Sequence, residues 1–260
     1  MRYLKLYWSF VKNSIARELM FRTHFFLSFT AHFLWFLMFI LFYTILYKDI
    51  NTINGWSYDQ SLLLLSVFFL IDTTGFTVFI KNFSTFPEYI SEGKLDILLT
   101  KPVDSQFMIC TRYFSLISLF SLGPELFLFI HQIIKMDLAL TPLSIALFCI
   151  FFLASLIIYA SIWFITNIIL FWVIKVEMIH EFFVMFFRFM QFPPDIFGGS
   201  LRIFFIGIMP VLFTISVPTQ ALQGIFEPTS IIALVVAAVI SLILSRILWK
   251  IGLKKYQSAA

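Results

Sequence analysis

Long apolar runs constrain this chain more than any other feature of its sequence. The run from Leu138 to Ile174 contains no charged residue. A helix needs about 20 apolar residues to cross about 30 Å of hydrocarbon. Because these runs are continuous and do not alternate with polar residues, they argue against a transmembrane β-barrel. The sequence therefore predicts an all-α protein that crosses a membrane several times.

Composition and charge agree with a membrane protein. Of the 260 residues, 61% are hydrophobic, 12% are charged and 36 are Phe, which no soluble domain of this length matches. The net charge is +4, but the basic residues gather at the chain ends and in one loop, a pattern typical of membrane topology rather than nucleic-acid binding. Cys110 and Cys149 fit no metal motif and support no disulfide.

Six membrane crossings are expected. The apolar runs place them at about residues 25–46, 61–80, 107–134, 138–174, 178–192 and 229–249. Asn54-Gly55 predicts a turn between the first two, and Gly123-Pro124-Glu125 predicts a kink in the third.

Prolines interrupt the chain before the last crossing. Pro193 and Pro194 must end a helix, and Pro210 and Pro218 follow within an apolar stretch. Residues 193–226 are therefore predicted to form a re-entrant region, with a broken hairpin over 201–223 that does not cross. An alternative keeps residues 178–200 at the cytoplasmic face and makes 201–221 the fifth crossing.

Residues 1–22 predict a basic amphipathic helix lying at the membrane surface. Its apolar positions recur at helical spacing: Leu4, Trp8, Val11, Ile15 and Leu19. A signal peptide is disfavoured because charges interrupt the segment throughout and no small-residue cleavage site follows it.

The distribution of Lys and Arg predicts the orientation. With both termini in the cytoplasm, nearly every cation lies inside, and Lys48, Lys135 and Arg202 lie outside. The Phe- and Ile-rich composition suggests an AT-rich bacterial genome, so the expected location is the inner membrane of a bacterium.

A charged island over residues 82–106 separates the second and third runs. Leu95, Leu98 and Leu99 fall on one face of a short helix, Gly93 permits a bend before it, and Pro102 ends it. Such a helix can present itself to a partner at the membrane surface. The residues expected to contact that partner are Glu88, Glu92, Gly93, Lys94, Leu95, Asp96, Leu98, Leu99, Lys101 and Pro102. The alternative is a linker whose leucines lie in the lipid interface.

Three charged residues lie at apparent membrane depth: Asp72, Glu125 and Arg188. Each costs about 2.5–3.5 kcal/mol on insertion scales, so each should face protein or water. They could form a polar path or substrate contact, or a buried ion pair of Arg188 with Asp72 or Glu125. His24 and His32 are interpreted as packed or interfacial side chains rather than ligands.

Catalytic motifs are missing from the sequence. It has no G-x-x-x-x-G-K-[ST], and its Gly93-Lys94 pair is followed by Leu95, so the chain is not expected to bind ATP as a P-loop protein does. It has no G-x-S-x-G, and His180-Glu181 lacks the second His of a zinc protease helix. We expect no catalytic residue, metal or cofactor on this chain.

Two segments carry a resemblance to a known family. The stretch from Glu92 to Val103 resembles the "G-x-L-D-x-L-L-x-[RK]-P" segment of bacterial permeases of ABC-type exporters of the second integral-membrane class. Phe192-Pro193-Pro194-Asp195-Ile196-Phe197, with Met209-Pro210 and Val217-Pro218, resembles the "YPxDIF…IP…xP" ending of that branch. Phe192 replaces a common Tyr and Met209 a common Ile, both mild departures.

The resemblance covers essentially the whole chain and implies an exporter subunit. In that family the loop between spans two and three holds a coupling helix that docks on a separate ATPase, which binds ATP and Mg. Two permeases, the same or homologous chains, join two ATPases. The alternatives are an ATP-independent secondary carrier that uses Asp72, Glu125 and Arg188, and a membrane scaffold that recruits a soluble partner. The Phe-rich spans would suit an amphipathic cargo, but lipid-facing surface explains the same residues.

Overall fold

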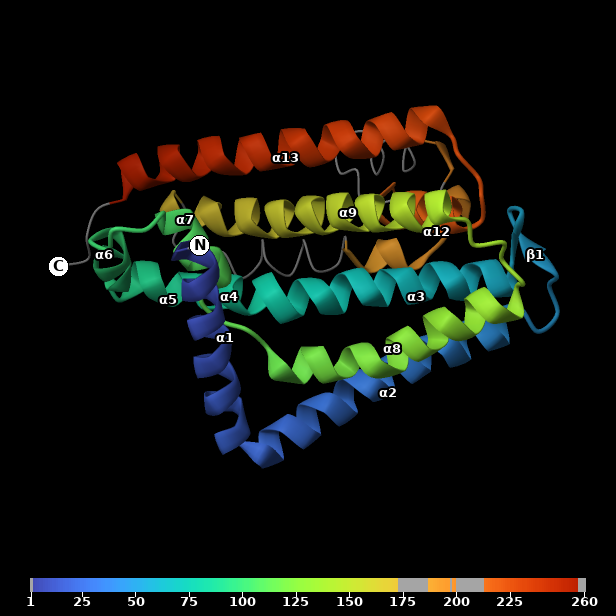
Figure 1. Ribbon diagram of the computed structural model, residues 1–260, viewed down its shortest axis with the longest axis horizontal. Coiled ribbons are helices and arrows are strands. Elements are labelled where there is room, and N and C mark those ends of the chain that lie inside the picture. Colours follow the sequence, from blue (N-terminus) through green and yellow to red (C-terminus); the bar gives the residue numbers. More distant parts are fainter. Residues whose placement is uncertain (1, 173–186, 197, 200–212, 257–260) are drawn as a thin grey trace.

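The computed structural model describes residues 2–172, 187–196, 198–199 and 213–256, and within them the chain is almost entirely helical (Figure 1). Its longer helices are α1 (Arg2–Met20), α2 (Arg22–Leu46), α3 (Tyr58–Gly75), α8 (Leu116–Lys135), α9 (Pro142–Ile168), α12 (Phe213–Leu222) and α13 (Pro228–Lys255). Its short elements are β1 (Thr52–Ile53), β2 (Trp56–Ser57), η1 (Phe76–Ile80), α4 (Lys81–Ser84), α5 (Phe86–Ser91), α6 (Lys94–Leu99), α7 (Ser105–Thr111), η2 (Ile169–Phe171), η3 (Phe189–Gln191) and η4 (Pro194–Ile196). The all-α prediction is confirmed.

Five helical stretches of the described residues are long and apolar enough to cross a membrane. They are Arg22–Leu46, Tyr58–Ser91, Leu116–Lys135, Pro142–Phe171 and Pro228–Lys255. The expected crossing at 178–192 lies mostly outside the described residues, as do Pro210 and the first half of the expected hairpin. The described part of helix α12 has 10 residues, and the residues directly before it lie outside the described residues. The sixth crossing stays a prediction.

The third crossing begins later than the sequence predicted. It was expected from residue 107, but α7 ends at Thr111 and α8 starts at Leu116. Buried Asn82 holds the intervening backbone: its Oδ1 accepts from the Tyr113 N–H at 2.6 Å, and its Nδ2 donates to the Tyr113 carbonyl at 2.8 Å. Because these bonds satisfy the backbone outside a helix, the apolar run divides there. Pro124 lies inside α8 and does not end it.

Helix α3 is the centre of the bundle. Every residue from Ser61 to Ile71 is buried, because α8 and α2 pack on one side of the helix and α9 and α12 on the other (Figure 1). Helix α13 packs against α9 and forms the outer layer. A helix that is apolar on all sides is expected only where neighbours cover every face, as they do here.

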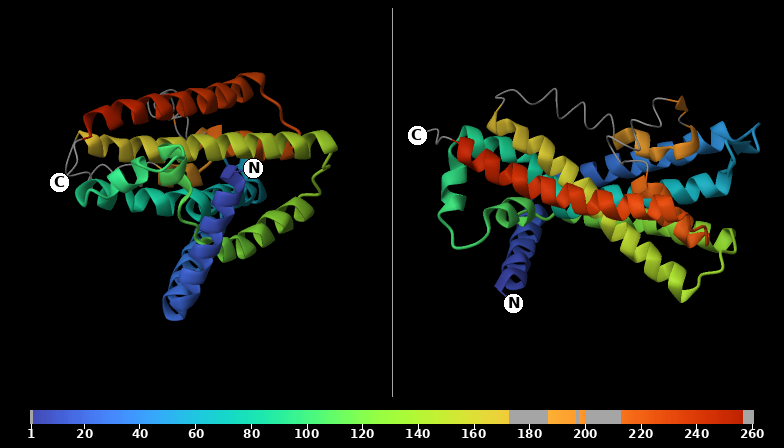
Figure 2. Two further views of the ribbon diagram at one scale, coloured as in Figure 1. Left: turned by 60° about the vertical axis from the view of Figure 1, so that its left-hand side comes forward. Right: turned by 90° about the horizontal axis from the view of Figure 1, so that it is seen from above.

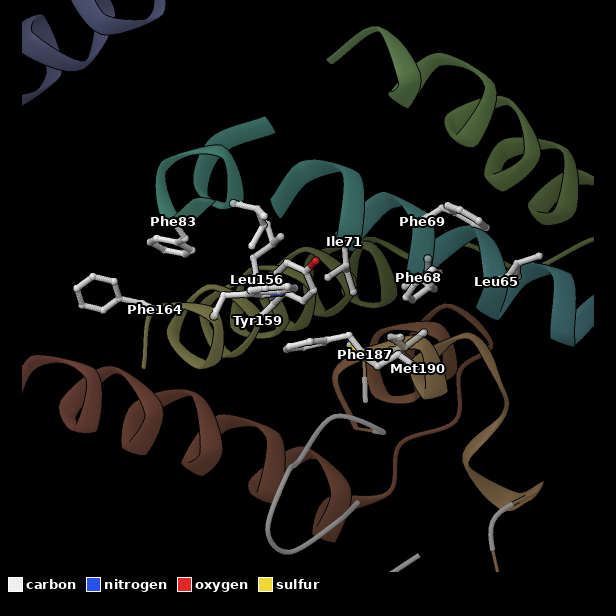
Figure 3. Packing of buried hydrophobic residues seen from close by; sticks show 14 of the residues in the cluster. Leu65, Phe68, Phe69, Ile71, Phe83, Leu156, Tyr159, Phe164, Phe187 and Met190 are labelled. Atoms are coloured by element: carbon white, nitrogen blue, oxygen red, sulfur yellow. The ribbon is translucent and has the colours of Figure 1, made fainter. Parts of the chain in front are cut away.

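The core between α3 and α9 is largely aromatic. Ile71 of α3 lies beside Tyr159 of α9, and Phe68 lies beside Met190 (Figure 3), whereas Phe69 faces α2, with its ring 5.0 Å from that of Phe36. The Trp163 and Phe187 rings stack with centroids 5.4 Å apart, and Tyr159 meets Phe187 edge-on at 4.9 Å. These contacts hold the segment around Phe187 against the middle of the bundle.

Helix α1 projects across the bundle rather than along it (Figures 1 and 2). Glu18 attaches its end: the carboxylate accepts from the Leu116 and Ile117 amides at 2.8 and 3.2 Å and forms an ion pair with Lys81. An acidic group at the positive end of α8 is electrostatically favourable. Leu4 and Trp8 are exposed on α1, which suits the predicted surface helix.

The two ends of the bundle differ in character. Both ends of the described chain lie beside α4–α7, whereas the β1–β2 hairpin and the α8–α9 connection lie at the opposite end (Figure 1). Asn54 and Gly55 have φ of +48° and +89° and form the hairpin turn that the sequence predicted. Asp195 joins this hairpin, since its carboxylate accepts from Trp56 Nε1 at 2.9 Å.

The close approach of α3 and α9 can be tested at Gly75. A Cβ at this position would lie 2.5 Å from Cε1 of Tyr159, so Gly75→Ala must displace the ring. We expect a loss of about 1–3 kcal/mol in unfolding free energy in detergent micelles. Gly123→Ala is the control, because a Cβ there meets nothing within 4 Å. Equal stability of the two variants would contradict this packing.

Candidate functional site

The charged island folds as two short helices joined at a bend. Helix α5 ends at Ser91 and α6 begins at Lys94, with Gly93 between them at φ +66°. This left-handed conformation suits glycine, because a Cβ there costs about 1–2 kcal/mol. Gly93 thus makes the bend expected from the sequence.

The inner face of α6 is part of the protein's own core. Leu95 and Leu98 are 0% and 1% exposed and belong to the same buried cluster as Met108 and Ile109 of α7. The expectation that Leu95 and Leu98 present an apolar face to a partner is therefore corrected. Residues at i and i+3 of α6 do share a face, but α7 and the bundle already cover it.

The opposite side of the island is exposed, and we call it the outer face. It consists of Pro87, Glu88, Ser91, Glu92, Lys94, Ile97, Leu99, Thr100, Lys101 and Pro102. Ile97 is 63% exposed and Leu99 is 39% exposed, so this face carries apolar side chains among charges of both signs. Glu92 pairs with Lys94 and raises the pKa of its ammonium. Ile97 was not among the residues expected from the sequence to contact a partner. It has the highest exposed fraction of the apolar side chains of α6.

An aromatic cluster fixes the island to the ends of α9 and α13. Phe86 of α5 lies 5.7 Å from Phe171 of η2 and 5.9 Å from Trp249 of α13, centroid to centroid, and Phe171 and Trp249 are 5.6 Å apart. Gly252 allows this approach, because a Cβ there would lie 2.3 Å from Phe171 Cδ2. The island therefore packs directly on these two helix ends.

Polar contacts add a second connection between the loop and α13. Arg246 pairs with Asp104 and donates to Gln106 Oε1 at 2.8 Å, and Trp249 Nε1 donates to Ser105 Oγ at 3.2 Å. Burial alone would raise the pKa of Asp104, but the Arg246 guanidinium and the Phe107 amide hold it below its ordinary value. Asp104 is therefore ionised at neutral pH and retains the pair.

The three charges at membrane depth have different partners from those expected. Asp72 Oδ1 accepts from the Tyr159 hydroxyl at 2.6 Å, and Glu125 Oε1 lies 2.9 Å from His32 Nε2. The Arg188 guanidinium lies over the Trp35 ring, 5.5 Å from its centroid. Of the two interpretations drawn from the sequence, the ion pair of Arg188 with Asp72 or Glu125 is therefore not found among the described residues.

The contacts of His32 were also not predicted from the sequence. His32 was interpreted as a packed side chain, but it contacts Glu125 and lies 3.3 Å from Thr73 Oγ1, which donates to the same carboxylate oxygen at 2.7 Å. The available signal was its position within an apolar crossing that contains no other ionisable group until Tyr43. Helices α2, α3 and α8 are joined through this contact.

The remaining candidates have structural surroundings. Pro193 is buried beside η4, which includes Pro194, and Pro218 is buried within α12. Within the described residues, no group of three or more His, Cys, Asp or Glu is arranged to hold a metal ion.

Comparisons with known proteins identify a family. The sequence profile of a family described as "ABC-2 family transporter protein" matches residues 33–260. Comparisons with curated proteins and with solved structures find no match.

Adjacent residues of α6 test the two faces of the island. Leu98→Ala removes a buried side chain and should lower the unfolding free energy by about 2–5 kcal/mol. Ile97→Ala, one position away and 63% exposed, should change it by no more than about 0.5 kcal/mol. Denaturant titration of both variants in the same detergent measures the difference. If Leu98→Ala were as stable as Ile97→Ala, the inner face would not be core.

Proposed function

This chain belongs to the ABC-2 family of transporter proteins, and we propose that it is the transmembrane subunit of an ATP-driven exporter. In this proposal it forms the translocation path and couples to a separate ATPase subunit. ATP and Mg bind to that partner, and this chain contributes no catalytic residue. The protein is a multi-pass membrane protein of a permease family.

One observation carries the coupling proposal: the island has an exposed outer face and an inner face fixed to the bundle. Ile97 and Leu99 offer apolar contact, and Glu88, Glu92 and Lys101 surround them with charge. Protein interfaces commonly combine a few apolar anchors with a charged rim that sets orientation. Because Phe86 packs on Phe171 and Trp249, a partner that moves the outer face would move the ends of α9 and α13.

The arrangement of cations supports a cytoplasmic position for the island. Both ends of the described chain lie at the same end of the bundle as the island (Figure 1). Most Lys and Arg residues lie in these segments, as the positive-inside rule requires of the cytoplasmic side. We therefore place both termini in the cytoplasm and the protein in a bacterial inner membrane, with α1 at the lipid interface. Six crossings, with 178–192 as the fifth and 193–226 re-entrant, satisfy this orientation.

The proposed assembly contains two permeases and two ATPases. The second permease is the same chain or a homologous one, and binding of ATP closes the ATPase pair. A ligand shifts a two-state protein only by its differential affinity for the two states. Here the closed ATPase pair would favour one position of the two coupled islands, and so one orientation of the permeases.

A secondary carrier is the second candidate, and the Glu125–His32 contact is the observation that favours it. An intramembrane pair of titratable groups is a functional-site hypothesis by default. Such a carrier would use Asp72, Glu125 and Arg188 and would transport its substrate without ATP. Transport by this chain alone in vesicles, indifferent to ATP, would establish the carrier and reject the exporter.

Ile97→Asp tests the coupling proposal. It puts a charge at the centre of the outer face while sparing the core, so it should weaken binding of the cognate ATPase by about tenfold or more and lower vanadate-sensitive transport in step. The measurement is co-purification of the ATPase together with transport into inverted vesicles.

The control is Ile50→Asp, the same substitution at a side chain that is 48% exposed and directly precedes β1, which lies at the opposite end of the bundle (Figure 1). It should leave ATPase binding unchanged. If Ile97→Asp retained wild-type ATPase binding and transport, the island would be a linker and the coupling proposal would fail.

A further inference from the structure

Two adjoining cavities extend from the island end of the bundle toward its middle. They measure about 420 and 260 Å³ and share four lining residues, His32, Phe76, Ser118 and Trp163. The larger cavity reaches Lys81 and Ser84 beside the island, and the smaller one reaches Asp72 and Arg188. Together they have the volume of a ligand site, which is typically about 300–1,000 Å³.

The smaller cavity contains one acid and one base that do not neutralise each other. Within the described residues, neither Asp72 nor Arg188 forms an ion pair. Asp72 accepts a hydrogen bond from Tyr159, and Arg188 lies over Trp35. A charge at this depth that has no counter-ion in the protein is expected to face water or a ligand.

The other charged side chains nearby have partners within the described residues. Glu125 is paired with His32, which also lines both cavities, and Lys81 at the far end is paired with Glu18. Among the described residues that line the cavities, the Asp72 carboxylate and the Arg188 guanidinium are therefore the charges left to interact with a ligand, one of each sign in the smaller cavity.

The walls are suited to an amphiphile. Trp35, Phe68, Phe76 and Trp163 present aromatic rings to the smaller cavity, and such rings attract alkylammonium groups. A guanidinium is the preferred partner of phosphate and carboxylate because of its planar set of donors. The larger cavity adds apolar side chains at Ile80 and Ile117 together with the hydroxyls of Ser28, Ser115 and Ser121.

We infer that this cavity binds the zwitterionic group of an amphiphile, with its ammonium at Asp72 and its phosphate or carboxylate at Arg188. The alkyl chain lies along Phe76, Ile80 and Ile117. The inference rests on the proposed transport function and gives that function a substrate class. Binding itself requires neither ATP nor the ATPase, so it can be tested separately.

The test is native mass spectrometry of the purified chain in a nonionic detergent. The probes are equimolar lysophosphatidylethanolamine, which is zwitterionic, lysophosphatidylglycerol, which is anionic, and hexadecyltrimethylammonium, which is cationic. The wild-type chain should prefer the zwitterion by about tenfold over either other probe, the effect of one additional charge-assisted hydrogen bond.

Single charge removals should reverse that preference in opposite directions. Arg188→Gln leaves the carboxylate and should favour the cationic probe, whereas Asp72→Asn leaves the guanidinium and should favour the anionic probe. A merely structural role for either residue would weaken all three probes alike. Asp59→Asn and Lys48→Gln remove charges outside the cavity and should retain the wild-type order.

Phosphoethanolamine without an acyl chain separates two sources of the zwitterion. If phosphoethanolamine binds weakly, the ligand is a membrane amphiphile. If phosphoethanolamine binds as well as the lysolipid, and Arg188→Gln and Asp72→Asn change the binding of both in the same way, the zwitterion site stands and its ligand is water-soluble. Absence of a zwitterion preference in the wild-type chain, or the same order of probes in both variants, would overturn the inference. Loss of ATPase coupling with the binding pattern intact would reject only the proposed function.

Discussion

The contact of Phe86 with Phe171 and Trp249 is the constraint on which the rest of the functional argument depends. Each aromatic pair contributes about 0.5–1.5 kcal/mol beyond the area it buries, and these three rings all contact one another. The pair of Arg246 with Asp104 holds the far side of the same loop. The island is thus packed against α9 and α13 at their shared end, and in the proposed mechanism force applied to its outer face would be passed to those two helices.

Satisfaction of polar groups explains how the remaining helices are placed. In hydrocarbon an unpaired backbone or side-chain group costs several kcal/mol. Asn82 satisfies the backbone of Tyr113 where the third apolar run divides, and Glu18 caps α8 from α1. Glu125, His32 and Thr73 join three helices around one carboxylate. The few polar side chains in this apolar chain therefore determine where helices begin and which helices meet.

The sequence predicts local features of this fold better than its long-range pairings. Long apolar runs predicted four of the helices that are long and apolar enough to cross a membrane, those of the first, second, fourth and last runs. Asn54-Gly55 and Gly93 predicted two bends. Each of these features depends on neighbouring residues. The direction of Leu95 and Leu98 could not be predicted, since helical spacing defines a shared face but not what covers it. The partner of Glu125 was missed for a related reason: His32 is 93 positions away, and no local pattern joins them.

The most direct test of the account is whether the island and α13 move as one body. Spin labels at exposed Ser91 and Lys250, with Cys110 and Cys149 replaced by Ser, would report the distance between them by double electron–electron resonance in the complex with the ATPase. A second pair at Ser91 and Thr23 shows whether the transporter has switched. The account predicts that addition of ATP and vanadate changes the second distance and leaves the first narrow and unchanged. A first distance that shifts or broadens while the transporter switches would contradict it.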